Sequence, residues 1–216
     1  IGWMENDEEI EIPSEYDNKP VVGIRGEVFA NVKTIKKVVL PDTIKEIRGQ
    51  AFQYASNLEE INIPDGITEI KGNTFEECNL KEVTIPDSVM DIGCGAFYNC
   101  DSLKTPLHNA HLFAYMPKSY SGEYAIPEGI KSIANLAFEG CSSLTSIIIP
   151  SSVTSIGNGA FIECPSLTHI EVHSNNAAYD SRNNCNAIIE TATNSLICGC
   201  SETIIPNDVI KIEWSA

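Results

Sequence analysis

Basic residues are scarce in this sequence. It has 14 lysines and arginines against 30 aspartates and glutamates, and its formal net charge is −16 at pH 7. A surface of this sign repels the phosphates of nucleic acids and of anionic lipids, so we expect neither as a partner. The sequence also has no apolar run of about 18 residues, the length of a membrane-spanning helix, so we expect no direct membrane insertion of this segment. The chain begins at Ile1 with no recognisable signal peptide, which a removed leader or a trimmed chain would each explain.

Catalytic signatures are scarce too. The sequence contains neither G-x-S-x-G nor G-x-x-x-x-G-K-[ST], the motifs of hydrolase nucleophiles and of phosphate-binding loops. Serines and acids fall mostly at repeat positions of the kind that usually faces solvent, although a sequence does not show whether two carboxylates pair in space for glycoside hydrolysis. We therefore predict no catalytic residue, no cofactor and a chain that is not an enzyme.

Spacings that resemble metal motifs are few. His108 and His111 are three residues apart, and His169 and His173 are four apart, but His169 is expected on a strand. Two histidines four apart come together on a helix, not on a strand, so we interpret all four as surface residues and predict no metal site. The acidic stretch 1–17 has no oxygen-ligand loop spacing, which speaks against calcium.

A repeated unit is what the sequence has instead. Its clearest copy, LTSIIIPSSVTSIGNGAFIECPSL, spans Leu144–Leu167, and neighbouring copies lie 22 or 23 residues apart where the pattern is regular. In five copies a proline is followed by a phenylalanine 11 residues later: Pro41 and Phe52, Pro64 and Phe75, Pro86 and Phe97, Pro127 and Phe138, Pro150 and Phe161. Fixed distances of this kind indicate a solenoid, in which each apolar side chain stacks on its equivalent one coil away.

Each part of the unit predicts a local structure. The L-x-x-I-x-I segment alternates and is rich in β-branched residues, so it predicts a short strand that the proline ends, and stacked copies form a parallel ladder. Val153–Ile156 predicts a second short strand on the other side. Ala160–Phe161, with Cys164 three residues later, predicts a single helical turn that points inward, with the phenylalanines forming a column.

The chain has eight cysteines, and four of them occupy one repeat position: Cys78, Cys100, Cys141 and Cys164. A shared position favours buried thiols that pack as small hydrophobic groups. A disulfide between Cys185 and either Cys198 or Cys200 stays open as an alternative for an oxidising compartment.

Two stretches interrupt the rhythm within one predicted solenoid over residues 1–216. Residues 103–127 form an irregular coil, because Pro106 occupies a strand position and should weaken that strand. Residues 173–200 form an insertion in which Ala187–Ile189 and Ser195–Ile197 flank a polar turn and predict a β-hairpin. Ala216 fills the position just before a phenylalanine, from which we expect a fragment of a longer array.

The pattern IPxxVxxIGxxAFxxCxxLxxIxIP, clearest in residues 149–170 and 85–103, resembles the BspA-like class of bacterial leucine-rich repeats over about 10–212. The irregular stretches resemble variant units of such proteins. The resemblance implies a right-handed leucine-rich-repeat solenoid of a secreted or surface-anchored bacterial protein, one that binds host or bacterial surface proteins and assists adhesion. It implies no shared catalytic site.

The exposed face of the strand ladder is the predicted binding surface, because repeat arrays commonly recognise partners through such faces. One outward column is Lys37, Glu60, Glu82, Ser146 and His169, and the next is Val39, Asn62, Thr84, Ile148 and Glu171. We also predict an exposed aromatic patch in the irregular coil, formed by Phe113, Tyr115, Tyr120 and Tyr124. A passive spacer, with a uniformly polar outside, and a carbohydrate-binding surface near residues 179–186 are the alternatives.

Overall fold

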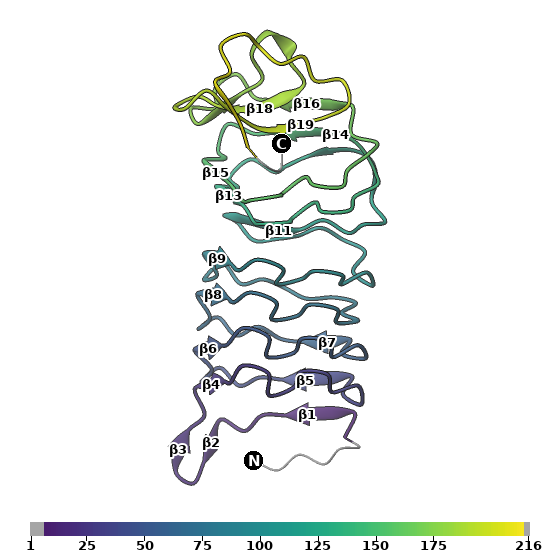
Figure 1. Ribbon diagram of the computed structural model, residues 1–216. Coiled ribbons are helices and arrows are strands. Elements are labelled where there is room, and N and C mark those ends of the chain that lie inside the picture. The colour runs from purple at the N-terminus through teal and green to yellow at the C-terminus, as the bar shows by residue number, and fades with distance from the viewer. Residues whose placement is uncertain (1–6, 214–216) are drawn as a thin grey trace. The chain divides into compact units, whose positions relative to one another are not determined.

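Parallel strands form a ladder in the first of the two units into which the chain divides, Ile1–Asn109 and Ala110–Ala216. The computed structural model describes residues 7–213. In the first unit β1 (Glu9–Glu11), β5 (Lys37–Val39) and β7 (Glu60–Ile61) pair in parallel, and Glu60 bridges to Glu82 one coil further on (Figure 1). The alternation predicted for these strands is present: Ile10, Val38 and Ile61 are buried between exposed or half-buried neighbours.

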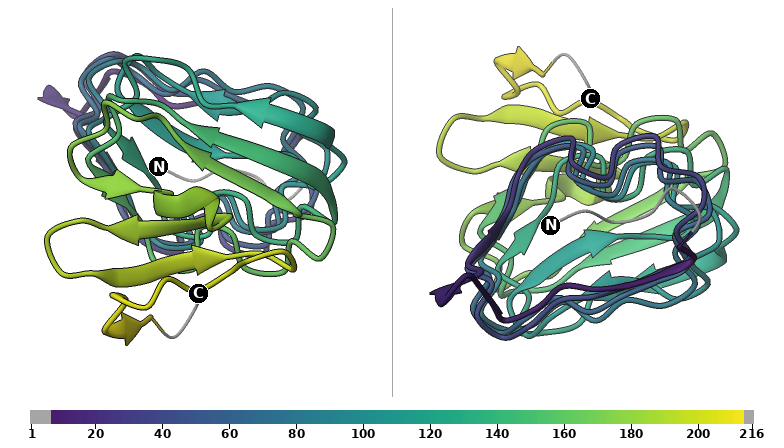
Figure 2. Two further views of the ribbon diagram at one scale, coloured as in Figure 1. Left: turned by 90° about the horizontal axis from the view of Figure 1, so that it is seen from above. Right: turned by 90° about the horizontal axis from the view of Figure 1, so that it is seen from below.

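A second series of short strands lies on the other side of this unit in Figure 1, as predicted. These strands pair in parallel two by two: β4 (Gly23–Ile24) with β6 (Glu46–Ile47), and β8 (Glu69–Ile70) with β9 (Asp91–Ile92). Seen along the stack in Figure 2, the purple and blue coils of the unit follow nearly the same path. The equal spacing of apolar residues therefore produces coils of equal shape.

The first coil contains an antiparallel hairpin, β2 (Glu15–Tyr16) with β3 (Lys19–Pro20). Asp17 and Asn18, at its tip, both have positive φ, as a tight two-residue hairpin turn requires. The part of the acidic stretch before Asp7 lies outside the described residues, as does the repeat position at Ala216.

Phenylalanines form the predicted column in the core of the first unit. Phe52 stacks on Phe29 with ring centroids 5.1 Å apart and on Phe75 at 5.6 Å, and Phe75 stacks on Phe97 at 5.4 Å. All four rings are buried. Aromatic stacking at this spacing adds to the free energy gained by removing each ring from water.

The predicted helical turn at the Ala-Phe position is not confirmed, because the residues there form successive turns and no helix. Its backbone bonds alternate between local turns and the neighbouring coil. The amide of Gln53 donates to the carbonyl of Gln50 (3.2 Å), whereas the amide of Phe52 donates to Thr74 (3.0 Å) and that of Tyr54 to Glu76 (2.8 Å). Gln50 and Tyr54 have φ of 62° and 59°, in the left-handed region, which a right-handed helix does not contain. The described chain has one short 3-10 helix, η1 (Arg182–Asn184).

The second unit repeats both ladders. One ladder consists of β12 (Ser121–Ala125), β14 (Ser143–Ile149) and β16 (His169–Val172), and the other of β11 (Leu112–Tyr115), β13 (Ser132–Ile133) and β15 (Ser155–Ile156). Phe138 stacks on Phe113 at 4.7 Å and on Phe161 at 4.9 Å. The phenylalanine column is thus present in each unit.

The two interruptions differ in structure. Residues 103–106 form no strand, as Pro106 predicted, and β10 (Leu107–His108) follows them. In the other interruption β17 (Tyr179–Asp180) pairs antiparallel with β18 (Ala187–Glu190), and β18 pairs antiparallel with β19 (Ser195–Gly199). β19 then pairs in parallel with β20 (Lys211–Ile212), so the polypeptide returns to the ladder pattern. The isoleucines of this last coil are exposed: Ile204, Ile205, Ile210 and Ile212.

The four cysteines at the shared repeat position link successive coils. The thiol of Cys78 donates a hydrogen bond to the carbonyl of Phe52 (3.1 Å), that of Cys100 to Phe75 (3.0 Å), and that of Cys164 to Phe138 (3.1 Å). Burial raises the pKa of the Cys78 thiol to about 12. All eight cysteines are free thiols, and the Cys185 disulfide alternative is not present.

Candidate functional site

The outward columns of the first unit lie in register on the strand face. Lys37 is paired with Glu60 in the parallel ladder, and Glu60 with Glu82. The Lys37 ammonium also contacts the Glu60 carboxylate at 3.1 Å, and this hydrogen bond, with the charges of Glu60 and Glu9, raises the pKa of Lys37. The sequence-predicted residues are therefore neighbours, and one lysine lies among several acids.

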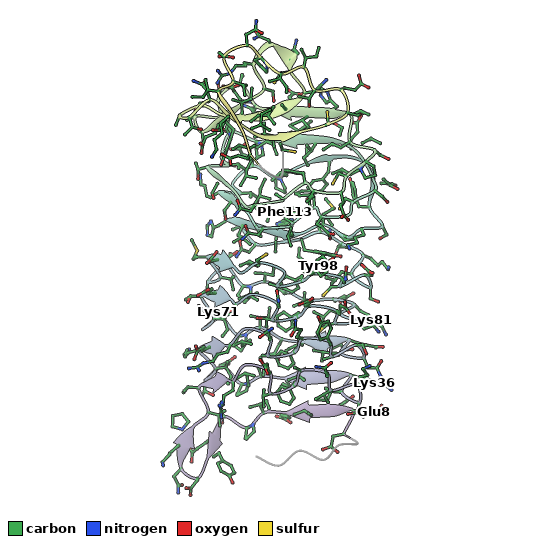
Figure 3. All side chains as sticks on the ribbon, in the orientation of Figure 1. Glu8, Lys36, Lys71, Lys81, Tyr98 and Phe113 are labelled. Carbon is green, nitrogen blue, oxygen red and sulfur yellow. The ribbon has the colours of Figure 1, made fainter. Side chains whose placement is uncertain are left out.

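A groove of about 500 Å³ follows this face. Its walls carry the charged residues Lys37, Glu60, Asp65 and Glu82 and the apolar residues Val39 and Val83. Further lysines of the unit form ion pairs away from the groove: Lys36 with Glu8 and Lys81 with Glu59 at one edge, and Lys71 with Glu69 at the other (Figure 3). The groove is consequently acidic with apolar walls.

Asn62 has a structural contact that the sequence did not reveal. Its amide oxygen accepts a hydrogen bond from the backbone amide of Leu40 (2.7 Å), and its amide nitrogen donates to the carbonyl of Leu40 (2.8 Å). The side chain thus completes the backbone pairing of the preceding coil. Of this column, Val39 and Thr84 remain exposed with no such contact described.

On the second unit the strand face brings together the other four predicted residues. Ser146 pairs in register with His169, and Ile148 with Glu171. Ser146 is only 6% exposed, which contradicts its prediction as a surface residue. It lies between Glu123 and His169 in the ladder, and a short side chain between two longer ones is readily covered. Ile148, in contrast, is 37% exposed.

The predicted aromatic patch does not form. Phe113 is fully buried and Tyr115 is 4% exposed, because β11 packs into the core, where Phe113 stacks on Phe138. Tyr120 and Tyr124 are half-buried and contact each other edge to face at 5.4 Å. Two of the four predicted aromatic residues are therefore core residues.

The second unit contains a pocket of about 610 Å³ where the second interruption folds against β16. We call it the β16 pocket. Its lining comes from two segments that the sequence analysis treated separately: His169, Ile170, Glu171, Val172, His173 and Ser174 from the strand and its end, and Asp180, Ser181, Arg182, Asn184 and Asn186 from the interruption. Sequence periodicity did not predict that β16 and the interruption line one pocket, since the interruption has no repeat register.

Asn176 anchors the interruption beneath this pocket. It is 8% exposed, and its amide nitrogen donates to the carbonyls of Pro150 (2.8 Å) and Val153 (3.0 Å). Its amide oxygen accepts from the backbone amides of Ala178 and Tyr179, both at 2.9 Å. All four hydrogen bonds available to an asparagine side chain are made.

Three further hydrogen bonds hold the segment that forms the pocket wall in place. The hydroxyl of Tyr179 accepts a hydrogen bond from the backbone amide of Ile156 (3.1 Å). The hydroxyl of Ser181 accepts from the amide of Val172 (3.0 Å) and donates to the carbonyl of Ala187 (2.9 Å), so it ties β16 to β18. The wall is thus positioned before any ligand binds.

Arg182 is held by carboxylates on both sides. Its guanidinium contacts Asp180 through Nε (2.9 Å) and one terminal nitrogen (2.7 Å), and its other terminal nitrogen contacts Asp208 at 2.5 Å. These hydrogen bonds raise the pKa of Arg182. Burial raises the pKa of Asp180, but the bonds from Arg182 outweigh burial and leave that pKa below its ordinary value. Arg182 is therefore held in place as part of the wall of the β16 pocket.

Metal ligation has no support in this arrangement. No group of three or more His, Cys, Asp or Glu side chains within residues 7–213 is placed to hold a metal ion.

The same residues include no helix long and apolar enough to span a membrane.

The stacked strands, the phenylalanine column and the proline-ended ladder define a leucine-rich-repeat fold. The chain matches the BspA type leucine-rich repeat region, in six copies, over residues 22–113 and 109–216. It belongs to the family of BspA-type leucine-rich repeats.

Solved structures agree with this assignment. A leucine-rich cell surface protein from Faecalibacterium prausnitzii A2-165 is 29% identical, with a TM-score of 0.59 over 89% of this chain and 54% of that one. A leucine-rich repeat protein from Eubacterium ventriosum (19% identical, TM-score 0.54) and the pneumococcal vaccine antigen PcpA (20% identical, TM-score 0.52) share the fold, each over 96% of this chain and 51% of the other. The chain thus spans about half the length of these three structures. No curated protein matches it significantly.

Proposed function

We propose that this chain is a non-enzymatic protein-binding module of a bacterial surface or secreted protein, which acts in adhesion to a host or bacterial surface protein. Two findings support an extracellular role: the family assignment, and the similarity to a bacterial cell surface protein at 29% identity. Leucine-rich-repeat folds generally serve as scaffolds for interactions and not for catalysis.

The observation that carries the proposal is the concave strand face of each unit. In the first unit, side chains from successive coils line a groove of about 500 Å³, and in the second, strand β16 and the interruption line the β16 pocket. A passive spacer needs no such concave, partly apolar surface, and exposed Val39 and Ile148 give each face an apolar contact point. A carbohydrate-binding surface near residues 179–186 would present an exposed aromatic ring to the sugar, and Tyr179 is buried.

The experiment is capture of host extracellular and mucosal proteins on the immobilised chain, compared with two charge-reversed variants. Glu60→Lys with Glu82→Lys changes the strand face of the first unit. Asp91→Lys makes the same kind of change at an exposed residue of the second ladder and is the matched control. We expect one specific partner to be lost with the double variant and retained with Asp91→Lys. Equal capture of the partner by the unchanged chain and by both variants would contradict binding through this face.

A further inference from the structure

We propose that the β16 pocket receives a lysine or arginine side chain of the protein partner. The inference rests on the proposed function in one respect only, namely that the cation belongs to a protein. It is carried by the hydrogen bonds of His169 and His173, by the carboxylate of Glu171, and by the wall of the pocket that Ser181 ties to β16.

The tautomer of His169 follows from its contact with Asn186. The Nδ1 atom of His169 lies 3.1 Å from the amide oxygen of Asn186, whose amide nitrogen points instead to the carbonyl of Glu202 (3.3 Å). An amide oxygen only accepts, so the proton lies on Nδ1 and neutral His169 presents the lone pair of Nε2. That lone pair lies 3.8 Å from Oε2 of Glu171.

Two acceptors at this separation favour a donor between them. A nitrogen about 2.8 Å from each atom completes the triangle, and a cationic N–H group makes the strongest hydrogen bonds of this kind. Within residues 7–213 the ion pairs of Glu171 include no lysine or arginine, whereas Glu60 of the first unit has Lys37. With His169 neutral, the described residues place no lysine or arginine between Nε2 of His169 and the Glu171 carboxylate, and a basic side chain of a partner suits this position.

The remaining groups complement a peptide rather than an isolated cation. The backbone amide of Asn175 donates to Nδ1 of His173 (3.2 Å), so neutral His173 keeps Nε2–H as a donor for a partner carbonyl. Ile148, beside Glu171 in the ladder, is 37% exposed and offers an apolar contact for the methylene stem of a basic side chain. Arg182 does not compete for Glu171, because Asp180 and Asp208 already hold it.

The test is a titration with capped tripeptides, followed by NMR of the histidine ring signals. The probes are acetyl-Gly-Lys-Gly-amide and acetyl-Gly-Arg-Gly-amide, and the neutral control is acetyl-Gly-Gln-Gly-amide. We expect saturable shifts of His169 and His173 with the basic probes, with dissociation constants on the order of 1 mM, as befits one anchored side chain. Glu171→Gln should weaken binding by about tenfold, equivalent to the loss of one charge-assisted contact.

The matched control is Asp91→Asn, which removes an exposed carboxylate of the second ladder in the first unit and should leave these shifts unchanged. Equal binding of the glutamine probe, equal affinity in Glu171→Gln, or the absence of saturation would each overturn the inference. Failure of this inference is distinguishable from failure of the proposed function. The capture experiment measures the dependence of partner binding on Glu60 and Glu82, and the tripeptide titration does not affect that result.

Discussion

The side-chain amide of Asn176 donates a hydrogen bond to the backbone carbonyl of Pro150 at 2.8 Å, across the point where the repeat is interrupted. The other interruption has the same arrangement, in which Asn109 donates to the carbonyls of Pro86 (2.9 Å) and Val89 (2.8 Å). In each case a buried asparagine closes the turn Pro-x-x-Val of the preceding coil. The asparagine side chain thereby hydrogen-bonds each irregular segment to the regular coil before it.

Replacing Asn176 by leucine should lower the free energy of unfolding by about 2–4 kcal/mol, because the carbonyls of Pro150 and Val153 and the amides of Ala178 and Tyr179 lose their partner. Urea denaturation measures this change. The same replacement at Asn207, which is exposed, should alter stability by less than about 0.5 kcal/mol. Equal effects at both positions would show that the buried contacts contribute nothing.

The phenylalanine column predicts a large cavity effect. Phe75 is fully buried between Phe52 and Phe97, so Phe75→Ala should destabilise the chain by about 3–5 kcal/mol. Met90→Ala, at a side chain that is 61% exposed, is the control and should cost little. A loss below about 1 kcal/mol for Phe75→Ala in thermal or urea unfolding would contradict the stacked core.

Close stacking of coils is tested at Gly93. A β-carbon there would collide with the backbone of Gly72, whereas one at Gly23 would meet its nearest atom, the carbonyl oxygen of Glu46, at 3.5 Å. Gly93→Ala should therefore destabilise by several kcal/mol, on the order of an overpacked core position. Gly23→Ala should stay within about 1 kcal/mol of the wild-type chain. The denaturant concentrations at the unfolding midpoints of the two variants measure this difference in stability.

Buried thiols predict a loss of stability in alkali. Burial raises the pKa of Cys78 from its ordinary value of 9.0 to about 12, so in this window the unfolded chain releases the proton and the folded chain keeps it. The contribution is fully present below pH 9.0 and falls as the pH rises toward 12, by about 1.4 kcal/mol per pH unit for this thiol. The free energy of unfolding of Cys78→Ala should fall less steeply with pH than that of the wild-type chain, measured between pH 8 and 10.5. Identical slopes would rule the effect out.

Much of the fold could be predicted from the sequence, because stacking requires equal residues at equal spacing. The strands ended by proline, the partners of Phe52 and the buried position of Cys78 all follow from that requirement. The backbone conformation at the Ala-Phe position could not be predicted from local spacing. Gln50 and Tyr54 adopt left-handed conformations, and their amides donate hydrogen bonds to the next coil.

The candidate site was only half visible in the sequence. His169 and Glu171 are recognisable as outward residues of a strand, and the structure places them side by side on β16. Phe113 and Tyr115 were misassigned because hydrophobic side chains in an irregular coil have no register that distinguishes core from surface. The wall from Asp180 to Asn186 depends on the contacts of Asn176, and a contact between different coils leaves no local pattern.

Carboxyl footprinting of the complex between this chain and its captured partner tests the central claim most directly. The strand-face carboxylates Glu60, Glu82 and Glu171 should become protected from modification, while Glu46 and Asp91, on the second ladder, should react as they do in the free chain. Protection of Glu46 and Asp91 with no change at the strand face would contradict recognition through that face.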